Sequence, residues 1–188
     1  NQLVEDNKQY GDWSILNNGE LDIIIPNKKL AIEFNGIYWH SELKGKDKNY
    51  HLNKTKQCNE KGIQLIHIFE TEWYFQKDIV SSLINAKLGI FDKRLYGRKC
   101  QIKEITSKEK NQFLDENHLQ GNDKSSVKLA LLYDEKIVSV MTFGKSRYNK
   151  NYQYEMHRFC SKIGYQIIGG ASKLWKYFIR KYEPESVI

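Results

Sequence analysis

A ribbon of two short strands near the N-terminus constrains the fold of this 188-residue chain more than any other feature. Residues 21–25 and 30–34 are apolar, β-branched runs, and the Pro-Asn-Lys-Lys segment between them has the composition of a turn. A turn at the centre of this tetrapeptide gives three facing pairs: Ile25 with Leu30, Ile23 with Ile32, and Asp22 with Glu33. A slip of one residue would separate the two acids and expose the apolar side of one strand, so we discount it.

Alternation along the ribbon sorts the side chains onto two faces. The apolar face is expected to be core and carries Leu21, Ile23, Ile25, Leu30, Ile32 and Phe34. The other face carries Glu20, Asp22, Glu33 and Asn35. Facing carboxylates repel unless a cation lies between them, and Mg²⁺, or Mn²⁺ as a substitute, suits such oxygen ligands. The alternative, which the pattern leaves open, is an ordinary solvated face of acidic residues.

Composition is typical of a soluble, globular protein that binds a polyanion. Hydrophobic residues make up 40% of the chain and charged residues 28%, and the net charge is +7 with twelve Tyr and four Trp. Basic charge with aromatic residues favours nucleic acid as a partner. Without a long apolar run or a signal peptide, we expect a cytoplasmic protein with no membrane partner. The three cysteines lack CxxC spacing and are expected to be reduced and buried.

The remaining pattern alternates helices and strands. We expect helices at residues 50–60, 78–88, 107–117 and 171–182, the third with Ser107 as its N-cap. Strands are expected at residues 63–69, 100–105, 127–133, 136–143 and 152–160. Residues 91–98 read as a basic, irregular segment and residues 164–170 as a loop, so the domain boundary is expected in the former. The predicted domains are residues 1–92 and 98–188.

The first half resembles the very-short-patch-repair (Vsr)-like nucleases and their homing-endonuclease relatives, a branch of the PD-(D/E)xK fold. The resemblance is carried by Leu-Asp-Ile-Ile-Ile-Pro at 21–26, Glu-Phe-Asn-Gly-Ile-Tyr-Trp-His at 33–40, and residues 50–55 and 62–73. It implies an α/β nuclease core that nicks or cleaves double-stranded DNA with Mg²⁺, as homing and phage endonucleases do. The family's strand aspartate falls on Asp22 and its histidine on His40.

The same resemblance implies roles for further residues. Asn35 stands where the repair enzymes have another histidine, and Glu33 is closer to a general PD-(D/E)xK site. Metal ligands are then Asp22 and Glu33, with Glu20 as a further candidate, and His40 is the general acid or base. The N-terminal helical acid of the family is Glu5 or lies before Asn1, because the chain begins without Met and is expected to be a fragment.

Two residues of the predicted helix at 50–60 complete the expected site. His51 and Lys54 are three residues apart on one face and could reach the same phosphate, although a surface histidine and a solvated lysine are the alternatives. His67, inside an apolar strand, is expected to be a hydrogen-bonded core residue. The adjacent rings of Tyr38 and Trp39 are expected to contact DNA bases, with core packing of Trp39 as the alternative.

The second half resembles a GNAT-like N-acetyltransferase domain of α+β architecture. The segments that carry the resemblance are 141–147, 155–160 and 167–175, the last with the pair Gly169-Gly170 before a helix. We expect this half to recognise DNA rather than to bind acyl-coenzyme A, with the fold's last strand and helix beyond Ile188. The basic residues expected at the DNA are Lys145, Arg147, Arg158 and Lys173. A nucleic-acid-modifying acyltransferase and a catalytically inactive DNA-binding module remain the alternative functions.

Overall fold

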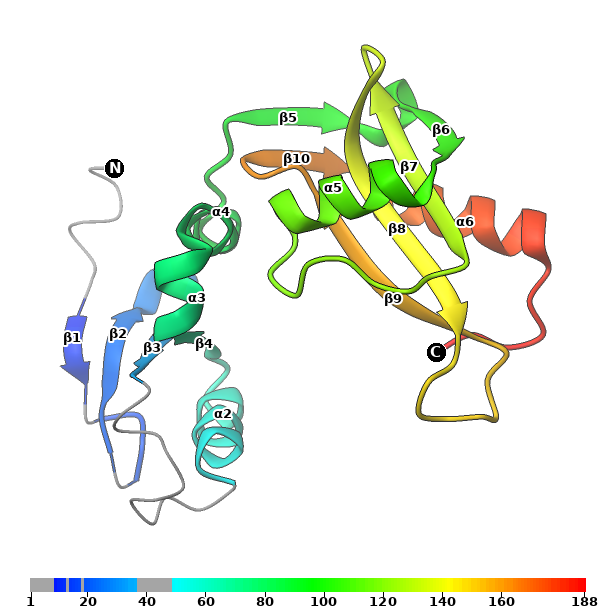
Figure 1. Cartoon of the computed structure of the whole chain (residues 1–188). Helices are drawn as coiled ribbons and strands as arrows, with labels where there is room; N and C mark the ends of the chain where they lie inside the picture. The colour runs from blue at the N-terminus through cyan, green and yellow to red at the C-terminus, as the bar shows by residue number, and fades with distance from the viewer. Residues whose placement is uncertain (1–8, 13, 18, 37–48) are drawn as a thin grey trace. The chain divides into compact units, whose positions relative to one another are not determined.

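The computed structural model describes residues 9–12, 14–17, 19–36 and 49–188, and its architecture is mixed α/β (Figure 1). The chain separates into two compact units, Asn1–Val80 and Ser81–Ile188, here called unit 1 and unit 2. The division falls inside helix α4 (Lys77–Leu88), before the segment in which the sequence pattern places a boundary. In the part of the chain that the structure describes, no helix is both long enough and apolar enough to cross a membrane.

Unit 1 is built on one four-stranded sheet with the order β1-β2-β3-β4 (Figure 1). Its strands are β1 (Gln9–Asp12), β2 (Leu21–Ile25), β3 (Leu30–Asn35) and β4 (Gln64–Phe69). The first three strands are antiparallel, whereas β4 runs parallel to β3, and helix α2 (Tyr50–Glu60) lies in the connection between them. A second helix, α3 (Glu70–Phe75), follows β4 directly.

The register of the β2–β3 ribbon is the one predicted. Ile23 pairs with Ile32 and Ile25 with Leu30, and the turn between them is the short 3₁₀ helix η1 (Pro26–Lys28). The assignment of one core face and one polar face was wrong, however. Ile24 and Ala31, on the supposed polar face, are buried in a cluster with Cys58 of α2, and Phe34 of the supposed core face is 43% exposed. Because α2 covers part of the second face, Glu33 and Asn35 are buried as well, whereas Glu20 is exposed.

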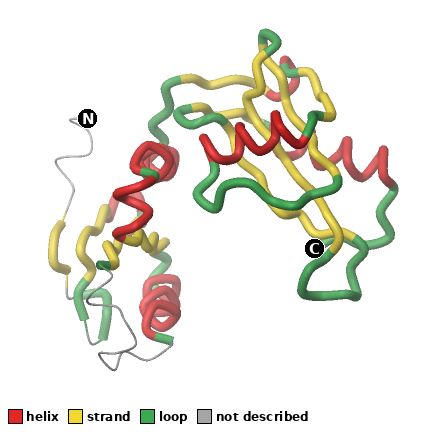
Figure 2. The backbone as a smooth tube through the Cα atoms, viewed as in Figure 1, coloured by secondary structure: helices red, strands yellow, loops and turns green. Residues whose placement is uncertain are grey.

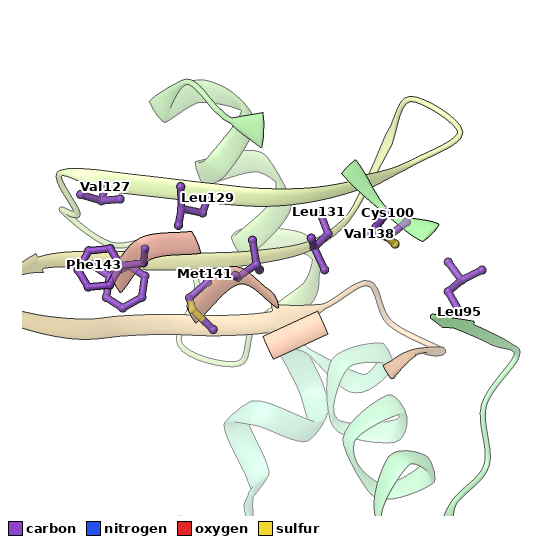
Figure 3. Close-up of a cluster of buried hydrophobic side chains, with 10 residues drawn as sticks. Leu95, Cys100, Val127, Leu129, Leu131, Val138, Met141 and Phe143 are labelled. Atoms are coloured by element: carbon purple, nitrogen blue, oxygen red, sulfur yellow. The ribbon is translucent and has the colours of Figure 1, made fainter. Parts of the chain in front are cut away.

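Unit 2 contains a four-stranded antiparallel sheet with the order β6-β7-β8-β9 (Figure 2). Its strands are β6 (Gln101–Glu104), β7 (Val127–Tyr133), β8 (Lys136–Lys145) and β9 (Tyr154–Ser161), with helices α5 (Ser107–Asn117) and α6 (Gly170–Tyr182). One core cluster lines the sheet and α6 and includes Leu129, Met141 and Phe143 (Figure 3). In that cluster the Phe143 ring stacks on Phe178 of α6 with 3.6 Å between the centroids.

Strand β9 contains a bulge at His157. The register passes from Thr142–Arg158 to Phe143–Met156, so His157 has no pairing partner on β8. Its ring lies against Gly144, where an added Cβ would come within 2.5 Å of a ring carbon. Glycine at 144 therefore makes room for the imidazole.

Three local predictions in unit 2 were wrong. Residues of the supposed irregular segment and loop form β5 (Lys93–Tyr96) and β10 (Tyr165–Ile168), which pair in parallel, and η3 (Gly97–Lys99) follows β5. The N-cap of α5 is Thr106 rather than Ser107, because its hydroxyl accepts the Glu109 amide while the Glu109 carboxylate accepts the Thr106 amide. All three cysteines are free as predicted; Cys58 and Cys100 are buried, whereas Cys160 is half-buried rather than buried, and the burial of its thiol raises its pKa to about 12.

Candidate functional site

The candidate site lies where α2 covers the ends of β3 and β4 in unit 1. Glu33 of β3 is 4% exposed and Lys54 of α2 is 7% exposed, and the Lys54 ammonium donates a hydrogen bond to Glu33 Oε1. Lys54 also donates to the Glu20 carbonyl over 3.0 Å and lies 5.1 Å from the centroid of the Tyr50 ring. The predicted partner of a phosphate is therefore a buried lysine that is paired with a predicted metal ligand.

Burial and charge act on Glu33 in opposite directions. Burial raises its pKa above the usual 4.5, the hydrogen bond and charge of Lys54 lower it, the charge of Asp22 raises it again, and the net shift is upward. Burial alone would lower the pKa of Lys54, but the bonds to Glu33 and Tyr50 outweigh it and the net shift is also upward. The ammonium therefore keeps its proton beside a carboxylate that is incompletely stabilised.

Asp22 is the neighbour of Glu33 that the register predicts. The backbone N–H of Phe34 donates to Asp22 Oδ2 over 2.7 Å, which fixes the carboxylate at the end of the ribbon. Within the described residues, Asp22 Oδ1 and the buried Glu33 Oε2 accept no hydrogen bond. Each acid therefore keeps one oxygen that could coordinate a cation.

Beside the acids, two side chains of β3 and β4 are joined to α2 by hydrogen bonds. The Asn35 amide nitrogen lies 3.3 Å from His67 Nδ1, and Thr55 Oγ1 lies 3.0 Å from His67 Nε2. Thr55 also donates to the His51 carbonyl over 2.8 Å. The prediction that His67 is hydrogen-bonded is confirmed, and its ring is held from both sides.

His51 belongs to an aromatic group next to this hydrogen-bonded chain. Its ring centroid lies 5.1 Å from that of His67, 5.8 Å from that of Phe69 and 5.4 Å from that of Tyr50, all in edge-to-face geometry. His51 and Lys54 thus face the same strands, as their spacing predicts. We call Asp22, Glu33, Asn35, His51, Lys54, Thr55 and His67 together the α2 polar cluster.

The remaining predicted residues of unit 1 fall outside the α2 polar cluster. Glu20 is exposed and contributes its backbone carbonyl to Lys54. Tyr38, Trp39 and His40 lie outside the described residues, as does Glu5. Tyr50 and Thr55 are the additions that sequence reasoning missed; Thr55, four residues after His51, lies on the helical face that the pattern had already singled out.

The chemistry of the cluster fits a hard divalent cation. No group of three or more His, Cys, Asp or Glu side chains suited to a metal occurs within residues 9–12, 14–17, 19–36 and 49–188. Mg²⁺, however, usually binds through one or two carboxylates and completes its shell with water and phosphate oxygens. Asp22 and Glu33, each with one oxygen not hydrogen-bonded within the described chain, could supply those carboxylates.

Unit 2 holds the four basic residues that the sequence assigns to DNA, and their environments differ. Arg147 is bonded to Glu155 through its side chain at 2.5 Å, and Arg158 donates to the carbonyls of Gly121 and His157. Lys173 donates to two backbone carbonyls of the β5–β6 connection. Lys145 is exposed and forms no ion pair with any described residue.

Comparison of the chain with protein-family models, curated proteins and solved structures gave no match.

Proposed function

We propose that the chain is a Mg²⁺-dependent DNA endonuclease whose active site is the α2 polar cluster. The observation that carries the proposal is the neighbouring pair Asp22 and Glu33, each with one oxygen not hydrogen-bonded within the described chain, beside the buried Lys54 ammonium. A site that places an acid of raised pKa, Glu33, beside a second acid and a cation under a helix is typical of chemistry rather than of stability alone. The strand order β1-β2-β3-β4 with α2 before the parallel β4 supports a PD-(D/E)xK core for unit 1.

Asp22 and Glu33 would hold the metal, which when bound polarises the phosphate and lowers the pKa of a coordinated water. Asp22 is oriented by the Phe34 amide, and Glu33 is oriented by Lys54. The hydrogen bond and charge of Lys54 oppose the rise that burial causes in the pKa of Glu33, so the lysine favours the ionised form of this ligand. Lys54 would also neutralise the charge that develops on the reacting phosphate.

Hydrolysis takes a proton from the attacking water and supplies one to the leaving oxygen, and a histidine is suited to both transfers. The resemblance assigns the role of general acid or base to His40. Among the described residues the candidate for this role is His51, whose ring contacts that of His67. His67 has both ring nitrogens within hydrogen-bond distance of Asn35 and Thr55, so it orients the neighbouring ring rather than exchanging protons itself.

The test is nicking of supercoiled plasmid with Mg²⁺ or Mn²⁺ and with EDTA. Asp22→Ala and Glu33→Gln are expected to lower the rate by a factor of about 10² to 10³, as loss of an electrostatic contact in the transition state does. Glu60→Gln, at the exposed end of α2, is the matched control and should nick at the wild-type rate. Metal-dependent nicking that survives in Asp22→Ala rejects the assignment.

A groove in unit 2 favours the acyltransferase as the second candidate. It has a volume of about 390 Å³ and is lined by Met156 and Phe159 of β9 and by Ala171 and Trp175 of α6. Acetyl-coenzyme A binding that is lost in Ala171→Trp would support this function. Wild-type protein that binds none of this cofactor would reject it.

A further inference from the structure

A second pocket of unit 2 lies at the end of β8 and has the composition of an anion site. Its volume is about 540 Å³, which is within the range of ligand-binding pockets. Residues that line it include Lys145, Ser146, Lys150, Tyr152 and Ser126. They come from the end of β8, from the segment that leads to β9, and from the segment just before β7.

The charge of this pocket is positive and is not neutralised from within unit 2. Lys145 and Lys150 are exposed and form no ion pair with any described residue, and no carboxylate lines the pocket. The nearest acid along β9, Glu155, is held by Arg147, which lowers the pKa of Glu155 to about 2. Two cations are thus left to attract an anion.

Ser146 supplies an independent observation. The residue is 7% exposed, it lines the pocket, and its hydroxyl has no hydrogen-bond partner in the described structure. A buried hydroxyl without a partner is costly unless a ligand or a water completes it. A phosphate oxygen is an acceptor of the right chemistry for this hydroxyl.

We propose that this pocket binds a backbone phosphate of the DNA that unit 1 cleaves, with Lys145 and Lys150 as its cations and Ser146 as its hydrogen-bond donor. The inference rests on the proposed function for its choice of DNA as the source of phosphate. Two aromatic residues support a nucleic-acid strand over a free anion. Tyr152 lines the pocket, and the neighbouring Tyr148 is 89% exposed, so a base could stack beside the bound phosphate.

The test is the affinity of the full chain for a labelled DNA duplex, measured in EDTA at salt concentrations between about 50 and 200 mM. Lys145→Ala/Lys150→Ala is expected to lower the slope of log K against log salt by about 1.8 and to weaken binding roughly 60-fold at about 0.1 M salt. Ser146→Ala removes a neutral donor, so binding should weaken about fivefold while the slope stays unchanged.

The matched control is Lys108→Ala/Lys136→Ala, which removes the same charge from exposed positions outside the pocket. It should keep the wild-type slope. The proposed phosphate site is rejected if Lys145→Ala/Lys150→Ala leaves the slope unchanged, or if the control lowers the slope by the same amount. Inorganic phosphate that raises the melting temperature of the wild type but not of Lys145→Ala/Lys150→Ala, together with unchanged DNA binding, overturns DNA as the source.

Because EDTA removes catalysis from the measurement, the two proposals can fail separately. If the wild type does not nick DNA but Lys145→Ala/Lys150→Ala still lowers the slope, the nuclease assignment is rejected and the phosphate pocket is supported. If Asp22→Ala abolishes nicking but Lys145→Ala/Lys150→Ala leaves the slope unchanged, the phosphate pocket is rejected and the nuclease assignment is supported.

Discussion

In each unit, the described residues include a buried pair of a helical lysine and a carboxylate, and the carboxylates of the two pairs accept different numbers of hydrogen bonds. In unit 1, Lys54 meets Glu33, which has one oxygen without a hydrogen-bond partner among the described residues. In unit 2, Lys110 of α5 bonds to Asp123 at 2.9 Å, and both side chains are 2% exposed. Asp123 also accepts from Thr142 at 2.5 Å and from the hydroxyl of Ser125 at 2.7 Å.

The pKa values of the two acids move in opposite directions for this reason. Burial acts to raise both, but the bonds from Thr142 and Lys110 lower the pKa of Asp123 to about 2, whereas Lys54 does not offset the burial of Glu33. A saturated pair contributes to stability and has no capacity for a ligand. A pair with an oxygen to spare is suited to bind a cation, which is the difference between a structural and a functional ion pair.

The largest expected effect is on stability, from Asp123→Ala. It leaves the buried Lys110 ammonium with only the backbone carbonyl of residue 123, and it removes the acceptor of the Thr142 and Ser125 hydroxyls, so the free energy of unfolding should fall by about 3–5 kcal/mol. In Glu33→Ala, Lys54 likewise keeps a backbone carbonyl, that of Glu20, but no hydroxyl loses its acceptor, so the loss should be about half as large. Urea unfolding followed by circular dichroism measures both, and equal losses would remove the distinction between the pairs.

Removing both partners together sharpens the comparison. Lys110→Met/Asp123→Asn should lower the free energy of unfolding by about 2–3 kcal/mol, since the hydroxyls of Thr142 and Ser125 lose a charged acceptor. Lys54→Met/Glu33→Gln should stay within about 1 kcal/mol of the wild type, because a buried pair replaced by neutral groups costs little. The second variant should nevertheless fail to nick DNA. A larger loss of unfolding free energy in Lys54→Met/Glu33→Gln than in Lys110→Met/Asp123→Asn would contradict this expectation.

Lowering the pH should change the contributions of Asp123 and Glu33 to the free energy of unfolding in opposite directions, and this effect is smaller than those of the substitutions. The pKa of Asp123 falls from 3.8 to about 2 on folding, so its contribution is complete above pH 3.8 and is lost as the pH falls towards 2, about 2 kcal/mol in all. The raised pKa of Glu33 has the opposite sign, and its effect favours the folded state at low pH and fades as the pH rises above 4.5. The free energy of unfolding, measured from pH 4 down to pH 2, should fall in the wild type by this amount and should not show this fall in Asp123→Asn.

Short-range pattern was enough to predict much of the fold. The facing pairs of the β2–β3 ribbon, the helix at Tyr50–Glu60 and the strand at Val127–Tyr133 follow from alternation, helical period and turn residues, all of which are local. The parallel pair of β5 and β10 was missed because each strand has four residues and their pairing joins distant parts of the sequence. Neither strand carries an alternation long enough to recognise.

Of the candidate site, too, local pattern predicted one part and missed another. Asp22 and Glu33 were predicted as neighbours from the register of a single ribbon. The burial of Glu33, its pairing with Lys54 and the position of Thr55 beside His67 depend on how α2 packs on the sheet, which no local pattern specifies. The Lys110–Asp123 pair had no signal in the sequence, because its acid lies in the connection between α5 and β7.

The bulge at His157 changes which side chains of β9 share a surface. In a regular strand Met156 and Phe159 would point to opposite sides of the sheet, yet both line the groove beside α6. The unpaired residue shifts the alternation by one position, so a single inserted amino acid assembles that apolar wall. Shortening β9 by one residue at this point would turn either the methionine or the phenylalanine toward α5 and divide the groove.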